Sequence, residues 1–85
     1  MLRYGLHINH PSNKARIHVV GGCASVQKAF KRAQAGEPYG PVHGEENGQW
    51  KWFETLQEAE AAQQESGKTL LDRCKRPPCR DQFPQ

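Results

Sequence analysis

Long apolar stretches are missing from this chain of 85 residues. No run of about 18 apolar residues occurs, which excludes a helix that spans a membrane. The opening stretch MLRYGLHINHP has neither the basic leader nor the apolar segment of a secretory signal peptide. We therefore expect a cytoplasmic protein with no membrane partner.

Apolar residues make up only 35% of the chain, and the mean hydropathy is −0.91. A chain this short buries a small core, and domains of this size often depend on a disulfide, a metal ion or a partner. Two tryptophans and three phenylalanines argue against disorder. We expect one monomeric domain over residues 1–80 and a disordered tail over residues 81–85.

Cysteine is scarce as well, because the chain has only Cys23, Cys74 and Cys79. Three cysteines cannot all pair within one chain, and structural disulfides are rare in a reducing compartment. Cys74 and Cys79 flank the sequence KRPP, whose prolines favour a turn that holds the two sulfur atoms near each other. A disulfide, two free thiols and half of a metal site all remain open for this pair.

The first third of the chain predicts a β-hairpin and a helix. The stretches YGLHINH (4–10) and ARIHVV (15–20) alternate as strands do, and the turn residues PSNK separate them. In residues 23–36, apolar side chains recur at helical spacing from Val26 to Ala33, and Gly36 ends the pattern. The Gly- and Pro-rich residues 36–48 predict a loop.

A strand, QWKWF (49–53), and a second helix (54–68) follow. Thr55 and Glu58 have capping-box spacing at the start of this helix, and Gly67 is the expected stop. These elements predict an α+β fold in the order ββαβα, with a hairpin at the N-terminus and a cysteine knuckle at the C-terminus. The residues expected to be buried between helices and sheet are Val26, Phe30, Phe53 and Leu56.

The pairs His18-x4-Cys23 and Cys74-x4-Cys79 are the strongest candidates for a chemical site. Structural zinc takes four nitrogen or sulfur ligands in a tetrahedron, often as two short-range pairs from separate segments. Several cations around the second pair would stabilise thiolates. The spacing favours a zinc site, with free thiols and a disulfide as the alternatives. The cations in question are Arg73, Lys75, Arg76 and Arg80.

The sequence IHVVGGC … WFETLQEAEAA … RCKRPPC resembles the small zinc-binding module at the N-terminus of the adaptive-response (Ada) DNA-repair protein, and related modules attached to nucleases. The resemblance covers roughly residues 16–80. It implies that His18, Cys23, Cys74 and Cys79 are the zinc ligands. The terminal knuckle has two more residues between its cysteines than the family pattern, so the alternatives to Cys79 are His7, His10 and His43.

In the Ada module one zinc-bound cysteine accepts methyl groups from alkylated DNA phosphates, and the resemblance raises this role for Cys23. His18, however, stands where the Ada module has a cysteine. A closed shell of one histidine and three cysteines is typical of a structural site. We therefore expect a structural zinc ion, with methyl acceptance as an alternative.

A net charge of +3 permits binding to nucleic acid or to a DNA-processing partner. Trp50 and Trp52 share one face of their strand, where they could stack on bases or instead cover the core. Lys14 and Arg16 could join the cations on the same side. The nucleic-acid-binding candidates are Lys28, Lys31, Arg32, Lys75, Arg76, Trp50 and Trp52.

Enzymatic activity is not expected. The chain has no Ser-His-Asp order and no phosphate-binding loop, since its glycine-rich segments lack a following Lys-Ser/Thr pair. Two functions remain: a zinc-binding module that interacts with nucleic acid, and a protein–protein adaptor. Binding to nucleic acid should weaken steeply with salt, and this dependence separates the two.

Overall fold

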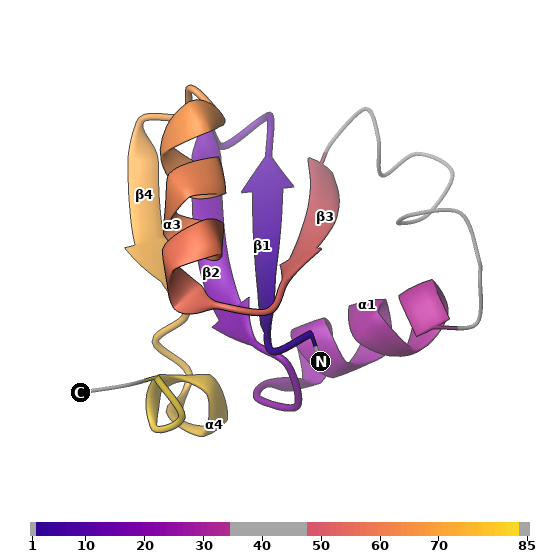
Figure 1. Cartoon of the computed structure of the whole chain (residues 1–85). Helices are drawn as coiled ribbons and strands as arrows, with labels where there is room; N and C mark the ends of the chain where they lie inside the picture. Colours follow the sequence, from indigo (N-terminus) through magenta and orange to yellow (C-terminus); the bar gives the residue numbers. More distant parts are fainter. Residues whose placement is uncertain (1, 35–47, 84–85) are drawn as a thin grey trace.

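The computed structural model describes residues 2–34 and 48–83. One four-stranded sheet runs in the order β3-β1-β2-β4 (Figure 1). β1 is antiparallel to β2 and β3, whereas β4 is parallel to β2. The mixture of sheet and helices confirms the α+β class. The elements are β1 (Tyr4–Asn9), β2 (Lys14–Val19), α1 (Ala24–Gln34), β3 (Gly48–Phe53), α3 (Leu56–Glu65), β4 (Leu70–Arg73) and α4 (Pro77–Arg80).

The predicted hairpin is confirmed, with Leu6 opposite Ile17 in its register. Asn13 takes a positive φ of 52° in the turn, a conformation that asparagine tolerates well. Because side chains alternate along a strand, the apolar ones share one face of the sheet. Those buried on this face are Tyr4, Leu6, Ile8, Ala15, Ile17 and Val19.

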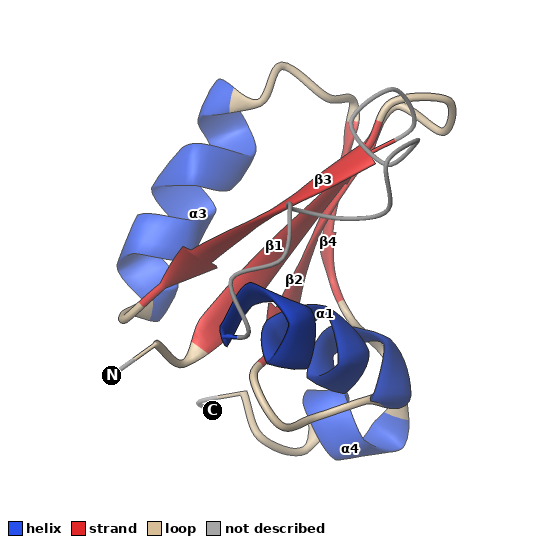
Figure 2. Ribbon diagram, turned by 90° about the vertical axis from the view of Figure 1, so that its right-hand side faces the viewer, coloured by secondary structure: helices blue, strands red, loops and turns tan. Residues whose placement is uncertain are grey.

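Helix α3 covers the apolar face, and α1 lies on the other side of the sheet (Figure 2). Thr55 is the N-cap of α3, and its hydroxyl oxygen accepts a hydrogen bond from the Glu58 backbone N–H at 3.1 Å. Ala59 and Gln63 are buried, and Leu56 packs against the core from a half-buried position. The predicted cap is confirmed. The helix ends at Glu65, just before Gly67, which has a positive φ of 75°.

Strand β4 was not predicted from the sequence. The predicted order ββαβα has no strand after the second helix, but residues 70–73 pair with β2, so that Asp72 lies opposite Arg16. The strand is only four residues long, and Leu70 and Leu71 are both exposed. Without alternation between apolar and polar positions, no periodicity marks the segment as a strand.

Residues 81 to 83, which the sequence predicts as part of a disordered tail, include a side chain that packs against the domain. Phe83 is buried and packs on the ring of Tyr4, with a centroid distance of 6.3 Å. The guanidinium group of Arg73 lies 5.2 Å from the centre of the Phe83 ring. An aromatic side chain in contact with both an aromatic and a cationic group is anchored. Residues 84 and 85 lie outside the described residues.

The expected burial of four apolar residues is confirmed in full only for Val26. Phe30 is half-buried and meets the edge of Trp52, with ring centroids 5.1 Å apart. Phe53 and Leu56 are half-buried against the core. The expected end of α1 at Gly36 and residues 36–47 of the predicted loop fall outside the described residues, whereas Gly48 begins β3. No helix within residues 2–34 and 48–83 is long and apolar enough to cross a membrane.

Candidate metal centre

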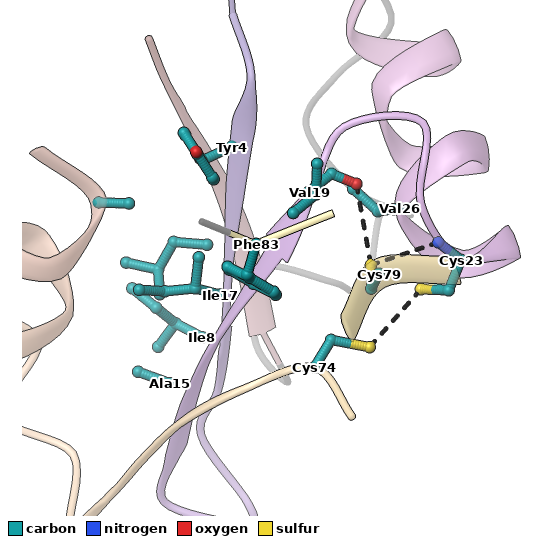
Figure 3. Close-up of a cluster of buried hydrophobic side chains, with 12 residues drawn as sticks. Tyr4, Ile8, Ala15, Ile17, Val19, Cys23, Val26, Cys74, Cys79 and Phe83 are labelled. Carbon is teal, nitrogen blue, oxygen red and sulfur yellow. Dashed lines mark hydrogen bonds between the residues drawn. The ribbon is translucent and has the colours of Figure 1, made fainter. Parts of the chain in front are cut away.

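Four segments bring His18, Cys23, Cys74 and Cys79 together at one end of the sheet. All four are buried, and their ligand atoms lie within 4.8 Å of one another. His18 is near the end of β2 and Cys23 directly precedes α1, while Cys74 follows β4 and Cys79 lies in α4. Figure 3 shows the three cysteines converging from separate parts of the chain. The two predicted pairs therefore form one cluster.

The parallel pairing of β2 and β4 places His18 beside Cys74. Ile17 lies opposite Arg73, and the backbone N–H of Cys74 donates to the carbonyl of Ile17 at 2.8 Å. His18 follows Ile17 and Cys74 follows Arg73, and both are members of the cluster. The strand that the sequence did not reveal is therefore the element that positions Cys74.

The distances within the cluster fit a tetrahedral shell. The Nδ1 atom of His18 lies 3.5 Å from the sulfur of Cys23 and 3.9 Å from that of Cys79. The sulfur atoms of Cys23 and Cys74 are 3.9 Å apart. Zinc–sulfur bonds of about 2.3 Å in a tetrahedron separate the sulfur atoms by roughly 3.8 Å. The residues present thus fit a zinc ion, and His18 would bind through Nδ1.

Glycine residues before α1 let the chain turn tightly around Cys79. Gly21 has a φ of 85°, and a Cβ atom on Gly22 would overlap the sulfur of Cys79. The backbone N–H of Cys23 donates to that sulfur at 3.3 Å, as Figure 3 shows. The side chain of Gln27 donates to the carbonyls of Gly21 and Gly22 at 3.2 and 2.8 Å, which fixes the turn.

Burial and hydrogen bonding set the protonation of the cluster. Burial lowers the pKa of His18 to about 4, with further lowering from His7 and nearby arginines, so the imidazole is neutral at pH 7. Burial alone would raise the pKa of Cys23, but hydrogen bonds from the Val26 backbone and the other two cysteines lower it. Burial raises the pKa of Cys79 to about 11. The neutral imidazole of His18 and the lowered pKa of the Cys23 thiol both favour binding of a metal ion.

The alternatives left open by the sequence now separate. All three cysteines are free, so Cys74 and Cys79 form no disulfide. Cys79 belongs to the cluster, whereas neither His7 nor His10 does. His10 is exposed in the hairpin turn. The third alternative, His43, lies outside the described residues.

Trp50 and Trp52 stack on each other along β3, with ring centroids 5.4 Å apart and planes 7° from parallel. Gly5 leaves room for both rings on the neighbouring strand. Trp50 also packs against the ring of His18 at 4.9 Å. Trp52 packs against Phe30, and Trp50 packs against His18. The pair therefore covers the sheet, and Trp50 also supports one member of the cluster.

A cavity of about 400 Å³ adjoins the cluster, between α1 and the polar face of the sheet. Of the cations named from the sequence as nucleic-acid candidates, Lys28, Arg32 and Arg76 line this cavity, as does Trp50. Lys31 and Lys75 lie outside its lining, and Lys75 is exposed.

Lys14 and Arg16, which the sequence suggested could join the other cations, also line the cavity, as does His7, which was considered only as an alternative metal ligand. Their signal was present in the alternation of the hairpin, because Lys14, Arg16 and His18 occupy every second position of β2 and so share one face.

Comparison of the chain with family models, curated proteins and solved structures finds no match.

Proposed function

We propose that this protein is a small zinc-binding module in which the metal ion is structural. The observation that carries the proposal is the cluster of His18, Cys23, Cys74 and Cys79, four buried side chains whose ligand atoms lie within 4.8 Å of one another. One imidazole and three sulfur atoms suit zinc better than magnesium or calcium, which prefer oxygen. Four protein ligands fill a tetrahedral shell and leave no position for substrate.

The core explains why such a module needs the metal. The largest fully buried side chains are few, namely Leu6, Ile17, Val26 and Cys79, and one of them belongs to the cluster itself. The cluster ties α4 and the end of β4 to the turn that precedes α1. Energy released by metal binding would therefore be folding energy.

Elemental analysis of the purified, reduced protein tests this proposal. It should find one zinc ion per chain, and Cys23→Ser and Cys74→Ser should each lose the metal, because each removes one corner of the same tetrahedron. His18→Ala should lose the metal for the same reason. His10→Ala is its matched control and should retain the metal, since His10 is exposed and outside the cluster. A Cys23→Ser variant that folds and retains stoichiometric zinc would remove Cys23 from the shell.

We further propose that the module acts by binding nucleic acid. Five cations line the cavity beside the cluster, and none of the described residues that line it is acidic. Such a surface attracts phosphates, and counterion release makes the affinity fall with salt. A partner protein is the competing candidate. Binding of a labelled oligonucleotide that disappears as salt rises supports the proposal, and a protein that retains no nucleic acid even at low salt contradicts it.

A further inference from the structure

We propose that the cavity beside the metal centre is a binding cleft for the phosphate backbone of single-stranded nucleic acid. This inference rests on the proposed nucleic-acid function and assigns it to one place. The cleft is defined by its cations, Lys14 and Arg16 from β2, Lys28 and Arg32 from α1, and Arg76 from the segment between Cys74 and Cys79.

The cations form two rows on opposite walls of the cavity. Lys14 and Arg16 are two residues apart on β2, so they point from the same face of the sheet. Lys28 and Arg32 are four residues apart on α1, so they lie one above the other on the same face of the helix. Rows of charge along a cleft suit a chain of phosphates better than one isolated anion.

Much of this charge is not neutralised by the protein. Arg16 forms a two-armed salt bridge with Asp72, at 2.9 and 3.0 Å. Lys14, Lys28 and Arg76 form no ion pair within the parts of the chain that the structure describes. Like charges held around one cavity repel one another, and an anionic ligand would relieve that repulsion.

The size and lining of the cleft favour a single strand over a duplex. A volume of about 400 Å³ between a helix and a sheet admits a flexible chain, whereas a duplex is a rigid cylinder that could only rest across the opening. Trp50 and His7 also line the cavity and form an aromatic pair, with ring centroids 4.7 Å apart. Aromatic side chains beside a basic groove are typical of single-strand binding.

The metal centre holds part of this cleft in place. Cys23 and Cys74 belong to both the cluster and the lining of the cavity. Arg76 lies between two members of the cluster, and Lys28 is in the second turn of the helix that begins after Cys23. The experiment must therefore use zinc-loaded protein, with zinc content measured on every variant.

Fluorescence anisotropy with a labelled single-stranded oligonucleotide compares two double variants of equal charge. Lys28→Gln/Arg76→Gln removes two cations that line the cleft. Lys31→Gln/Lys75→Gln removes two cations that do not. The cleft variant should weaken binding and reduce the salt slope by about 1.4, which is about 0.7 for each lost phosphate contact. The control variant should bind as the unmodified protein does, and both should retain zinc.

The other outcomes each overturn a defined part of the inference. Equal weakening by both double variants would show general attraction to a basic surface and remove the cleft while leaving nucleic-acid binding intact. Duplex binding as tight as single-strand binding, or displacement of the oligonucleotide by an equal concentration of inorganic phosphate, would contradict the single-strand assignment. Zinc-loaded protein that binds no oligonucleotide at low salt would remove the nucleic-acid function itself but not the metal site.

Discussion

At the scale of single residues, a glycine helps to shape the cluster of His18, Cys23, Cys74 and Cys79. A Cβ atom on Gly22 would overlap the sulfur of Cys79 and press on the carbonyl oxygen of Val19. We expect Gly22→Ala to weaken zinc binding strongly, because the backbone and Cys79 cannot both keep their places. A competition titration with a chromogenic chelator measures the change in affinity.

Gly21 supplies the control for this substitution. A Cβ atom added to Gly21 would meet no other atom within 4 Å, but its φ of 85° disfavours most side chains. Asparagine tolerates that conformation. Gly21→Asn should therefore retain zinc. Equal zinc affinity for Gly22→Ala and Gly21→Asn would mean that the turn is not fitted to the sulfur of Cys79.

The protonation states of His18 and Cys79 predict how metal binding depends on pH. The pKa of Cys79 is raised to about 11, so at pH 7 its thiol holds a proton that a metal ion must displace. The pKa of His18 is lowered to about 4, so its imidazole is already neutral at pH 7 and releases none. Zinc affinity should therefore increase with pH above neutrality, where ordinary histidine titration is complete.

Calorimetric titration of zinc at pH 7, in two buffers with different ionisation enthalpies, counts the protons released. At least one proton per zinc ion is expected, from Cys79. A heat that is independent of the buffer would contradict the raised pKa.

The members of the metal cluster could be predicted from the sequence because cysteine and histidine are chemically distinctive and their spacing is short within each pair. Lys14 and Arg16 were harder to assign, since charged residues on a strand are common and mark no particular partner. What the sequence could not show is that α1 lies across a cavity from the face of β2 that carries them. That placement is a long-range feature.

At the scale of elements, side-chain contacts support β4 in addition to its backbone pairing with β2. The side-chain amide of Gln63, in α3, donates to the carbonyl of Ala15 at 2.8 Å and to that of Asp72 at 2.9 Å. One buried amide therefore joins the helix to both parallel strands. The Arg16–Asp72 salt bridge adds a second link between the strands.

Replacing Gln63 should destabilise the domain through this link. Gln63→Ala leaves two carbonyl groups with fewer partners in a buried place, and we expect a loss of about 1–3 kcal/mol in the free energy of unfolding. Gln64→Ala is the matched control, because Gln64 is exposed one position further along the same helix. It should stay within about 0.5 kcal/mol of the unmodified protein.

Urea unfolding of zinc-loaded protein measures both variants. Equal midpoints for Gln63→Ala and Gln64→Ala would show that β4 does not depend on the buried amide.

The same contacts explain why the sequence did not predict β4. Leu70 and Leu71 are adjacent and both exposed, so apolar and polar residues do not alternate along β4. The strand forms by pairing with β2, which is distant in sequence.

The hairpin and α3 were predictable because their signals are local. The hairpin follows from alternation with a turn between its strands, and α3 follows from its Thr55 cap and the following glycine. The order of strands in the sheet and the anchoring of Phe83 against Tyr4 depend on contacts between distant parts of the chain. Neither leaves a local pattern.

At the scale of the whole molecule, the cluster of His18, Cys23, Cys74 and Cys79 joins the C-terminal segment to the turn before α1. Cys23 and Cys79 are 56 positions apart in the sequence but in contact in the structure. Helix α4, which carries Cys79, has only four residues. A helix that short has little stability of its own in water. We therefore infer that the shared cluster, together with the burial of Phe83, holds the C-terminal segment and the turn before α1 in place.

Thermal unfolding of the reduced protein, with one equivalent of zinc and again with an excess of a strong chelator, tests this central claim most directly. Circular dichroism should show a cooperative transition for the zinc-loaded protein. The chelated protein should be unfolded at room temperature, or should melt at a far lower temperature without a sharp transition. A cooperative melt that is the same with zinc and with chelator would show that the four residues do not form a metal centre on which the fold depends.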